Sequence, residues 1–124
     1  MCSDQIRILY VDDDPDQLEV VQEILETHFQ IETSACPAKA LDRLKEKNFD
    51  LLLTDVVMPS EDGVSLAKRV RQEHPNLGII AISGGGKEVC QMLDEELVSV
   101  FFDFIEKPVV WDDFIDRYGL QKSV

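Results

Sequence analysis

The sequence has no long apolar run and no basic leader. No apolar segment approaches the roughly 20 residues that a helix needs to span a bilayer. The first residues do not place a basic region before a long apolar one and a small-residue cleavage site, which is unlike a signal peptide. We therefore expect a cytoplasmic protein that does not bind membranes.

Cysteine and basic residues are also scarce. The three cysteines, Cys2, Cys36 and Cys90, are odd in number and have no metal-binding or C-x-x-C spacing, which favours reduced thiols over disulfides. Only 12 Lys and Arg residues stand against 25 Asp and Glu residues, so the formal net charge is -13. This charge opposes direct binding to nucleic acid and favours cations or basic protein surfaces as partners.

The remaining composition describes one folded domain. The chain has 124 residues, of which 44% are hydrophobic and 30% are charged. These values are typical of a soluble globular domain with a single core, and the length leaves no room for a second module. We expect a single domain over residues 1–124, without an output domain.

Strand and helix patterns alternate along the chain. Short segments rich in branched and apolar side chains predict five strands, at 6–11, 31–35, 49–55, 77–83 and 100–105. Apolar residues at helical spacing predict five helices, at about 15–29, 37–47, 64–74, 87–98 and 111–118. This alternation favours an α/β fold in which a doubly wound parallel sheet is covered by helices on both faces.

The segment Phe49–Pro59, FDLLLTDVVMP, contains the most apolar of these strands. Its run of three leucines is typical of a central strand that is buried on both faces. Asp55 would then lie at the carboxyl end of this strand, on the edge where open α/β sheets bind ligands. The alternative is that Asp55 only caps the turn before Pro59.

Polar residues stand at the ends of four predicted strands: Asp12 and Asp13, Asp55, Ser83 and Lys107. The carboxyl ends of parallel strands meet at one edge of a sheet, so we expect these side chains to converge. Three neighbouring carboxylates repel one another unless a hard cation neutralises them, and Mg²⁺ binds few carboxylates together with phosphate oxygens. A hydroxyl and an ammonium group would bind the other oxygens of a transferred phosphoryl group. The pattern predicts phosphoryl transfer to a carboxylate.

The chain resembles the receiver domains of two-component response regulators through four motifs in order, VDDDP, LLLTDVVMP, AISGG and FIEKP. The resemblance covers essentially the whole chain. It implies a flavodoxin-like fold with strand order 2-1-3-4-5 and a phosphoryl donor that is a sensor histidine kinase or a histidine phosphotransfer protein. It also implies that the protein is not an enzyme for other substrates and catalyses only its own phosphorylation and slow dephosphorylation.

The resemblance implies roles for the acidic residues. Asp55 resembles the phosphoacceptor, Asp13 the direct Mg²⁺ ligand and Asp12 the outer-shell partner of that ligand. Val57 corresponds to the residue that lends a backbone carbonyl to the metal. Together these four residues form the expected magnesium set.

Four further residues match switch, phosphate-pairing and structural positions of receivers. Ser83 resembles the switch hydroxyl, and Phe104 resembles the aromatic residue that changes rotamer. Lys107 resembles the lysine that pairs with the phosphoryl group, and Pro108 resembles the proline that follows a cis peptide. We expect phosphorylation to act through these residues on a protein-binding surface.

That surface is expected on the fourth helix, the fifth strand and the fifth helix. Val100 and Phe101 stand where receivers usually have Gly-Ala, and the aromatic residues Phe101, Phe102 and Phe104 are suited to anchor a downstream protein. Ordinary core packing of these rings is the alternative. A homodimer that forms on phosphorylation is also compatible with the resemblance.

Other interpretations start from the same acidic residues. Asp12, Asp14, Asp16 and Glu23 match carboxylate positions of a calcium-binding loop, but Gln17 stands where that loop needs glycine. Phosphatases with an aspartyl nucleophile share the Asp-x-Asp pattern, but need Thr or Val in place of Asp16. The main alternative is a receiver-like interaction module that is never phosphorylated, although such a module has no physical need for three clustered carboxylates.

Overall fold

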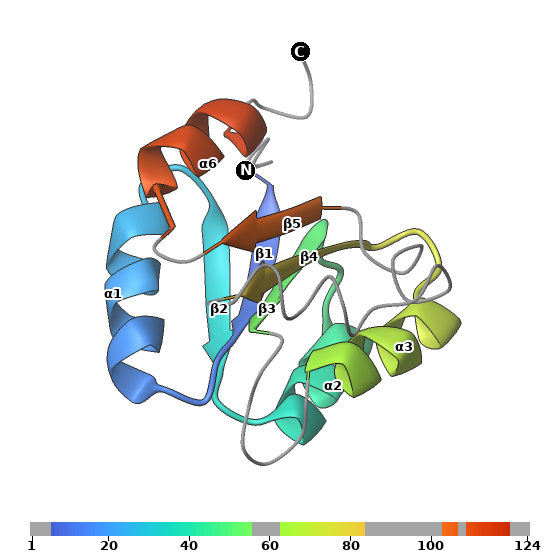
Figure 1. Cartoon of the computed structure of the whole chain (residues 1–124). Coiled ribbons are helices and arrows are strands. Elements are labelled where there is room, and N and C mark those ends of the chain that lie inside the picture. The colour runs from blue at the N-terminus through green and yellow to red at the C-terminus, as the bar shows by residue number, and fades with distance from the viewer. Residues whose placement is uncertain (1–5, 56–62, 84–102, 107–108, 120–124) are drawn as a thin grey trace.

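The computed structural model describes residues 6–55, 63–83, 103–106 and 109–119. These residues form β1 (Arg7–Val11), α1 (Pro15–Leu25), β2 (Gln30–Ser34), α2 (Pro37–Glu46), β3 (Leu51–Asp55), α3 (Gly63–Glu73), β4 (Gly78–Ser83), β5 (Asp103–Glu106) and α6 (Trp111–Tyr118). The predicted alternation of strands and helices is confirmed for these elements (Figure 1). The helix predicted at about 87–98 lies outside the described residues.

The five strands form one parallel sheet in the order β2-β1-β3-β4-β5. All residues of the central strand β3 are buried, as expected for a strand that is covered on both faces. From β1 the chain first builds outward to β2 and then returns to place β3 on the other side of β1, which creates a switch point at their carboxyl ends. The predicted strand order and the flavodoxin-like fold are confirmed.

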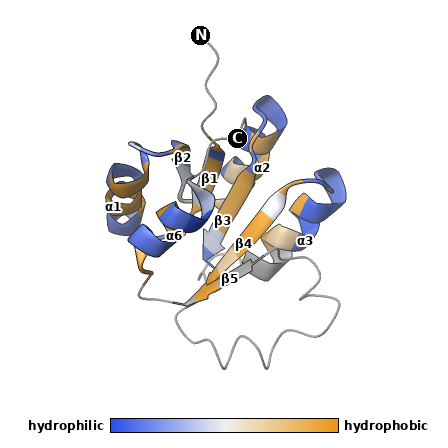
Figure 2. Ribbon diagram, turned by 90° about the horizontal axis from the view of Figure 1, so that it is seen from above, coloured by the Kyte–Doolittle hydropathy of each residue, from blue (hydrophilic) through white to orange (hydrophobic). Residues whose placement is uncertain are grey.

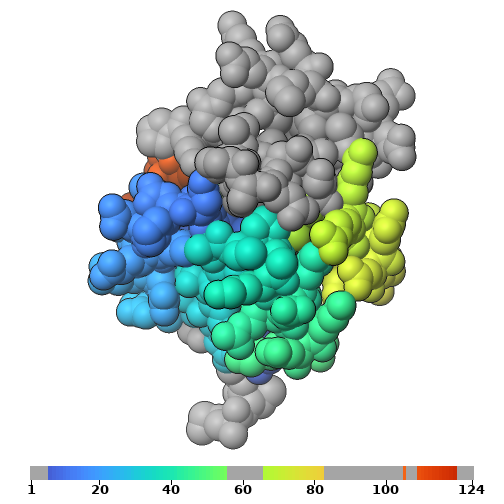
Figure 3. All heavy atoms as spheres, turned by 90° about the horizontal axis from the view of Figure 1, so that it is seen from below, coloured from blue at the N-terminus to red at the C-terminus, as the bar shows by residue number. Residues whose placement is uncertain are grey.

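Helices cover both faces of the sheet. Figure 2 shows α1 and α6 on one side of the largely hydrophobic strands β1, β3 and β4, and α2 and α3 on the other. Alternate residues of a strand point to opposite faces. Ile8 and Tyr10 of β1 therefore pack in the layer of α1 and α6, whereas Leu9 and Val11 pack in the layer of α2 and α3. In Figure 3, α2 and α3 lie side by side at the surface of the second layer.

The first helix begins as predicted and ends earlier. Asp14 caps it by accepting a hydrogen bond from the backbone N–H of Asp16 at 3.0 Å, and Pro15 occupies its first position. The prediction that this helix reaches Phe29 is wrong, because α1 ends at Leu25. Phe29 lies in the turn after α1, and its backbone N–H still donates a hydrogen bond to the Leu25 carbonyl. Its buried ring packs on Phe114, with 5.6 Å between the ring centroids. Phe29 is therefore a core residue in a turn, and its apolar side chain at helical spacing made the predicted helix too long.

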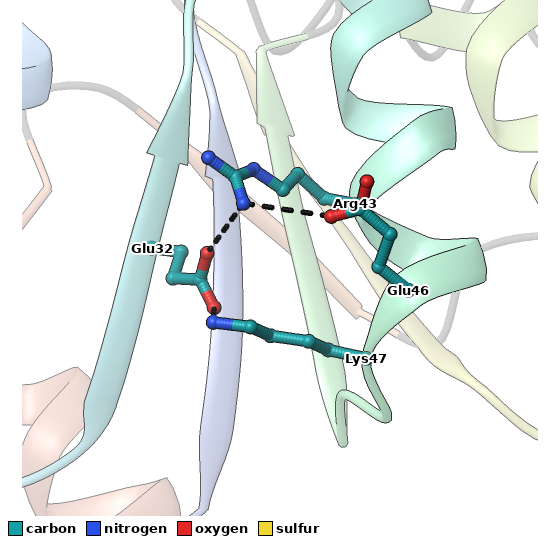
Figure 4. A network of polar contacts seen from close by, with 4 residues as sticks. All are labelled: Glu32, Arg43, Glu46 and Lys47. Carbon is teal, nitrogen blue, oxygen red and sulfur yellow. Dashed lines mark hydrogen bonds and ion pairs between the residues drawn. The ribbon is translucent and has the colours of Figure 1, made fainter.

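The partly polar edge strand β2 is held to α2 by an ion-pair network (Figure 4). Lys47 Nζ lies 2.9 Å from one carboxylate oxygen of Glu32, and Arg43 lies 3.9 Å from the other. Arg43 also lies 3.6 Å from Glu46, one turn along α2. The charged side chain of β2 therefore contacts the α2 segment. This explains why the sequence of β2 is partly polar and predicts a strand only weakly.

The helices are short. Those within the described residues have 8 to 11 residues, and none of them is both long and apolar enough to cross a membrane. Their amphipathic sequences instead bury one side against the sheet, as Ala40, Leu41 and Leu44 of α2 do.

Candidate functional site

The carboxyl edge of the sheet brings the predicted aspartates together. Val11 of β1 pairs with Thr54 of β3, so the next residues, Asp12 and Asp55, leave the two central strands side by side. Asp55 in turn pairs with Ile82 of β4, which places the backbone of Ser83 one residue beyond it. The site is therefore positioned by the register of three hydrogen-bonded strands.

Three carboxylates form a potential cation site. Asp12, Asp13 and Asp55 each offer an oxygen atom, and these three atoms lie within 4.8 Å of one another. Asp12 is 1% exposed and Asp55 is 6% exposed, whereas Asp13 faces the solvent. Two buried acidic side chains thus lie beside an exposed one, through which a hard cation could reach the cluster from the solvent.

Asp12 is held from several sides. Its carboxylate accepts a hydrogen bond from the hydroxyl of Tyr10 at 2.8 Å on one oxygen and from the backbone N–H of Asp14 at 3.0 Å on the other. Its own backbone N–H donates to the Ser34 carbonyl of β2 at 3.2 Å. A carboxylate that already accepts two protein hydrogen bonds is suited to the outer-shell role expected for Asp12.

The electrostatic shifts follow from this crowding. Partial desolvation and, next, the neighbouring carboxylate of Asp12 raise the pKa of Asp13, and the charge of Asp55 adds to the effect. Burial and, next, the hydrogen bond to Asp12 raise the pKa of Tyr10 well above its usual value. The Tyr10 hydroxyl therefore remains a donor, and the raised pKa of Asp13 means that its negative charge is disfavoured when no cation is bound.

The predicted nucleophile is carried by rigid backbone. Asp55 is the last residue of β3, and the hydroxyl of the fully buried Thr54 donates to the Asp55 carbonyl at 3.0 Å. β3 pairs with β1 from Leu51 to Thr54 and with β4 from Leu51 to Asp55. Asp55 is buried at the end of β3 and lies within the acidic cluster. Residues 56–62 lie outside the described residues, so the alternative that Asp55 caps the turn after β3 stays a hypothesis.

The remaining predicted residues are described only in part. The backbone of Ser83 ends β4 and pairs with Glu106, and the backbone of Phe104 lies in β5 opposite Ala81. The side chains of Ser83 and Phe104 are not among the described ones. Val57, Lys107 and Pro108 lie outside the described residues, as do Phe101 and Phe102, so their roles stay predictions.

The donor set of the cluster fits magnesium. Three carboxylates supply only oxygen ligands, and Mg²⁺ prefers a site with few carboxylates and several remaining positions for water or phosphate oxygens. The calcium-loop interpretation is wrong, because Pro15–Leu25 is an α-helix that contains both Asp16 and Glu23. A helix over these positions cannot wrap their side chains around one ion.

Tyr10 is a site residue that the sequence patterns do not single out. It lies within an apolar strand, yet its hydroxyl donates a hydrogen bond to Asp12. The signal was present, since residues two apart on a strand share a face and a tyrosine at this spacing can reach the carboxylate that follows the strand.

Comparison with known proteins agrees with this fold. The response regulator receiver domain model matches residues 8–118. The chain is 42% identical over 84 residues to the response regulator receiver protein CpdR of Brucella abortus, covering 63% of this chain and 66% of that protein. It is 32% identical over 122 residues to ARR21 of Arabidopsis thaliana, named as a two-component response regulator, covering 96% of this chain and 19% of that protein.

A solved structure has the same fold. The response regulator TrrA of Thermotoga maritima, in complex with Mg²⁺ and BeF, superposes with a TM-score of 0.78 at 24% identity, over 90% of this chain and 95% of that chain. The chain belongs to the response regulator receiver domain family. It spans slightly under two thirds of the Brucella relative and about a fifth of the Arabidopsis one.

Proposed function

We propose that this receiver domain accepts a phosphoryl group on Asp55 from a phosphohistidine donor in a reaction that requires Mg²⁺. The observation that carries the proposal is the cluster of Asp12, Asp13 and Asp55 at the carboxyl edge of the sheet, with oxygen atoms within 4.8 Å of one another. Family membership supports phosphoacceptor chemistry. The Thermotoga neighbour was solved in complex with Mg²⁺ and BeF, which supports the proposal of a Mg²⁺ site in a protein of this fold.

The chemistry follows from the roles of the residues. A carboxylate oxygen of Asp55 attacks phosphorus in line with the nitrogen of the phosphohistidine, so that an O–P bond forms as the N–P bond breaks and the histidine leaves with its electron pair. Asp13 and the Val57 carbonyl would hold Mg²⁺, with Asp12 in its outer shell. The bound metal would neutralise charge on the phosphoryl oxygens. Lys107 would pair with a further phosphoryl oxygen.

The phosphorylated carboxylate would then act as a switch. The hydroxyl of Ser83 would bind a phosphoryl oxygen, and Phe104 would change rotamer with it. We propose that this alters a protein-binding surface on the fourth helix, β5 and α6, to which a downstream protein binds. Amide exchange with and without beryllofluoride tests the surface, and protection changes confined to α1 would contradict it.

The partners and the setting are part of the same proposal. A sensor histidine kinase or a histidine phosphotransfer protein would supply the phosphoryl group, and the domain would act as a cytoplasmic regulator. Its net charge of -13 disfavours direct contact with nucleic acid. The domain would catalyse only its own phosphorylation and dephosphorylation.

The test is phosphorylation of the purified protein with acetyl phosphate and Mg²⁺, followed by intact mass. Wild type should gain one phosphoryl group, and both EDTA and Asp55→Asn should abolish the gain. Asp50→Asn is the matched control, because Asp50 immediately precedes the opposite end of β3. Its carboxylate accepts a hydrogen bond from the backbone N–H of Arg7 at 2.9 Å. Undiminished labelling of Asp55→Asn would refute the assignment. No labelling of wild type by any donor would favour the module that is never phosphorylated.

A further inference from the structure

Tyr10 connects the acidic site to the hydrophobic layer beneath α1 and α6. Its ring is buried in the same apolar cluster as Val21 and Leu25 of α1 and Phe114 of α6. Its hydroxyl reaches the edge of the sheet and donates to Asp12 at 2.8 Å. One side chain thus contacts both the cation site and the interior of the domain.

The connection continues to the start of α6. The ring of Trp111, the first residue of α6, meets the ring of Tyr10 edge to face, with 6.4 Å between centroids and 87° between planes. Trp111 in turn meets Phe114 edge to face at 5.5 Å. Phe114 contacts both Phe29, beyond the end of α1, and Tyr118, at the end of α6. Aromatic contacts of this geometry are directional, so a shift of one ring changes the packing of the next.

We infer that Tyr10 is a positioning residue that orients Asp12 for the cation and couples occupation of the cation site to the packing of Trp111 on α6. The inference rests on the proposed function, since it takes the acidic cluster to be the Mg²⁺ site. It adds a route to α6 that runs through β1 and the interior of the domain, separate from the route through Ser83 and Phe104.

The geometry explains why the hydroxyl matters. The backbone N–H of Asp14 engages one carboxylate oxygen of Asp12, and the Tyr10 hydroxyl engages the other. Together they fix the plane of the carboxylate. Without the hydroxyl one anchor remains, and the carboxylate can rotate away from the orientation that a cation and its bound waters require. Outer-shell hydrogen bonds of this kind typically change metal affinity by about 10- to 100-fold.

The same hydrogen bond can carry a signal. A bound cation polarises the carboxylates around it and shifts their positions. A change at Asp12 therefore alters its hydrogen bond with the Tyr10 hydroxyl. The Tyr10 hydroxyl is rigidly joined to a ring that lies against Trp111, and this tryptophan is the only one in the chain. Its emission therefore reports on the end of the proposed route.

The experiment titrates Mg²⁺ into the purified, unphosphorylated protein, with affinity measured by calorimetry and the response measured by tryptophan emission. Tyr10→Phe keeps the ring and removes the hydroxyl. We expect its Mg²⁺ affinity to fall about 10-fold and its emission change at saturating Mg²⁺ to fall below half of the wild-type change. Tyr118→Phe is the matched control, since it removes a hydroxyl from the same aromatic cluster at the far end of α6. It should keep both wild-type values.

The outcomes separate the two proposals. If wild type binds Mg²⁺ and Tyr10→Phe binds it equally well with the full emission change, this inference is overturned and the proposed function stands. A weakened affinity with an undiminished emission change at saturation would overturn the coupling to Trp111. If wild type binds no Mg²⁺, the metal site fails and the inference fails with it. Thermal unfolding in EDTA checks that each variant is folded, and a purely structural role of Tyr10 would lower stability without changing Mg²⁺ affinity.

Discussion

Asp12 and Asp55 lie side by side because the residues that precede them, Val11 and Thr54, form a Cα pair between the two central strands. The sheet itself therefore imposes the proximity of two carboxylates, and Asp13 adds a third. This arrangement favours cation binding, but it lowers the stability of the folded protein when no cation is bound.

Asp13→Asn should stabilise the metal-free protein at neutral pH, by less than about 1 kcal/mol for an exposed charge. The pKa of Asp13 is raised above its usual value of 3.8 in the folded state. Ionising it therefore costs folding free energy, a cost that is absent below the unfolded pKa and complete above the folded pKa. The advantage of the Asn variant should grow as the pH rises from about 4 to 7. Urea unfolding in EDTA measures it.

Added Mg²⁺ should reverse the order of stability. A ligand that binds only the folded state stabilises it, so wild type should gain stability and Asp13→Asn should gain little. Asp42→Asn, at an exposed aspartate of α2, should respond to Mg²⁺ as wild type does. Equal stabilisation of wild type and Asp13→Asn by Mg²⁺ would rule out Asp13 as a ligand.

The phosphoryl group on Asp55 should be lost slowly from the isolated domain. Hydrolysis needs a water held in line with phosphorus, and a side chain that hydrogen-bonds this water contributes through positioning. By resemblance to receivers, the residues nearest this path are Val57 and Gly85, two residues after the phosphoacceptor and after Ser83. Neither has a side chain that can hydrogen-bond water.

Loss of the label from purified phosphoprotein measures this lifetime. We expect Val57→Asn and Gly85→Glu each to accelerate the decay by about 10-fold, which is below the roughly 10²- to 10⁴-fold effect of a general acid or base, because Asn or Glu would here only position the water. If neither variant decays faster than wild type, the absent side chains do not control the lifetime. The measurement uses the domain without its histidine partner, because back-transfer would shorten the apparent lifetime.

Glu32→Gln should lower the free energy of unfolding by about 0.5–1 kcal/mol, because Glu32 pairs with Lys47 and Arg43 across β2 and α2. Exposed ion pairs are screened by salt, so the loss should shrink in about 1 M NaCl. Glu23→Gln, at an exposed glutamate of α1, is the control and should change stability less. A loss that is independent of salt would mean that packing, and not charge, holds β2 to α2.

The sequence by itself determined most of the elements and the convergence of three carboxylates. The leucines of β3 predicted a buried central strand because a strand covered on both faces is largely apolar, and they are buried. Asp14 and Pro15 predicted the start of α1 because capping depends on the residues at the helix end alone. The placement of Asp12, Asp13 and Asp55 at strand ends predicted their convergence, since parallel strands end at one edge.

Only the tertiary structure decided the contacts between distant segments. The end of α1 was predicted too late because Phe29 is apolar at helical spacing, but its partner is Phe114 on α6, and no local pattern contains that contact. The same holds for the burial of Asp12 beside an exposed Asp13, and for the Tyr10 ring against Trp111. The local periodicity of the sequence determines which face of a helix or strand carries a side chain. The packing of the helices on the sheet determines which residues that side chain contacts.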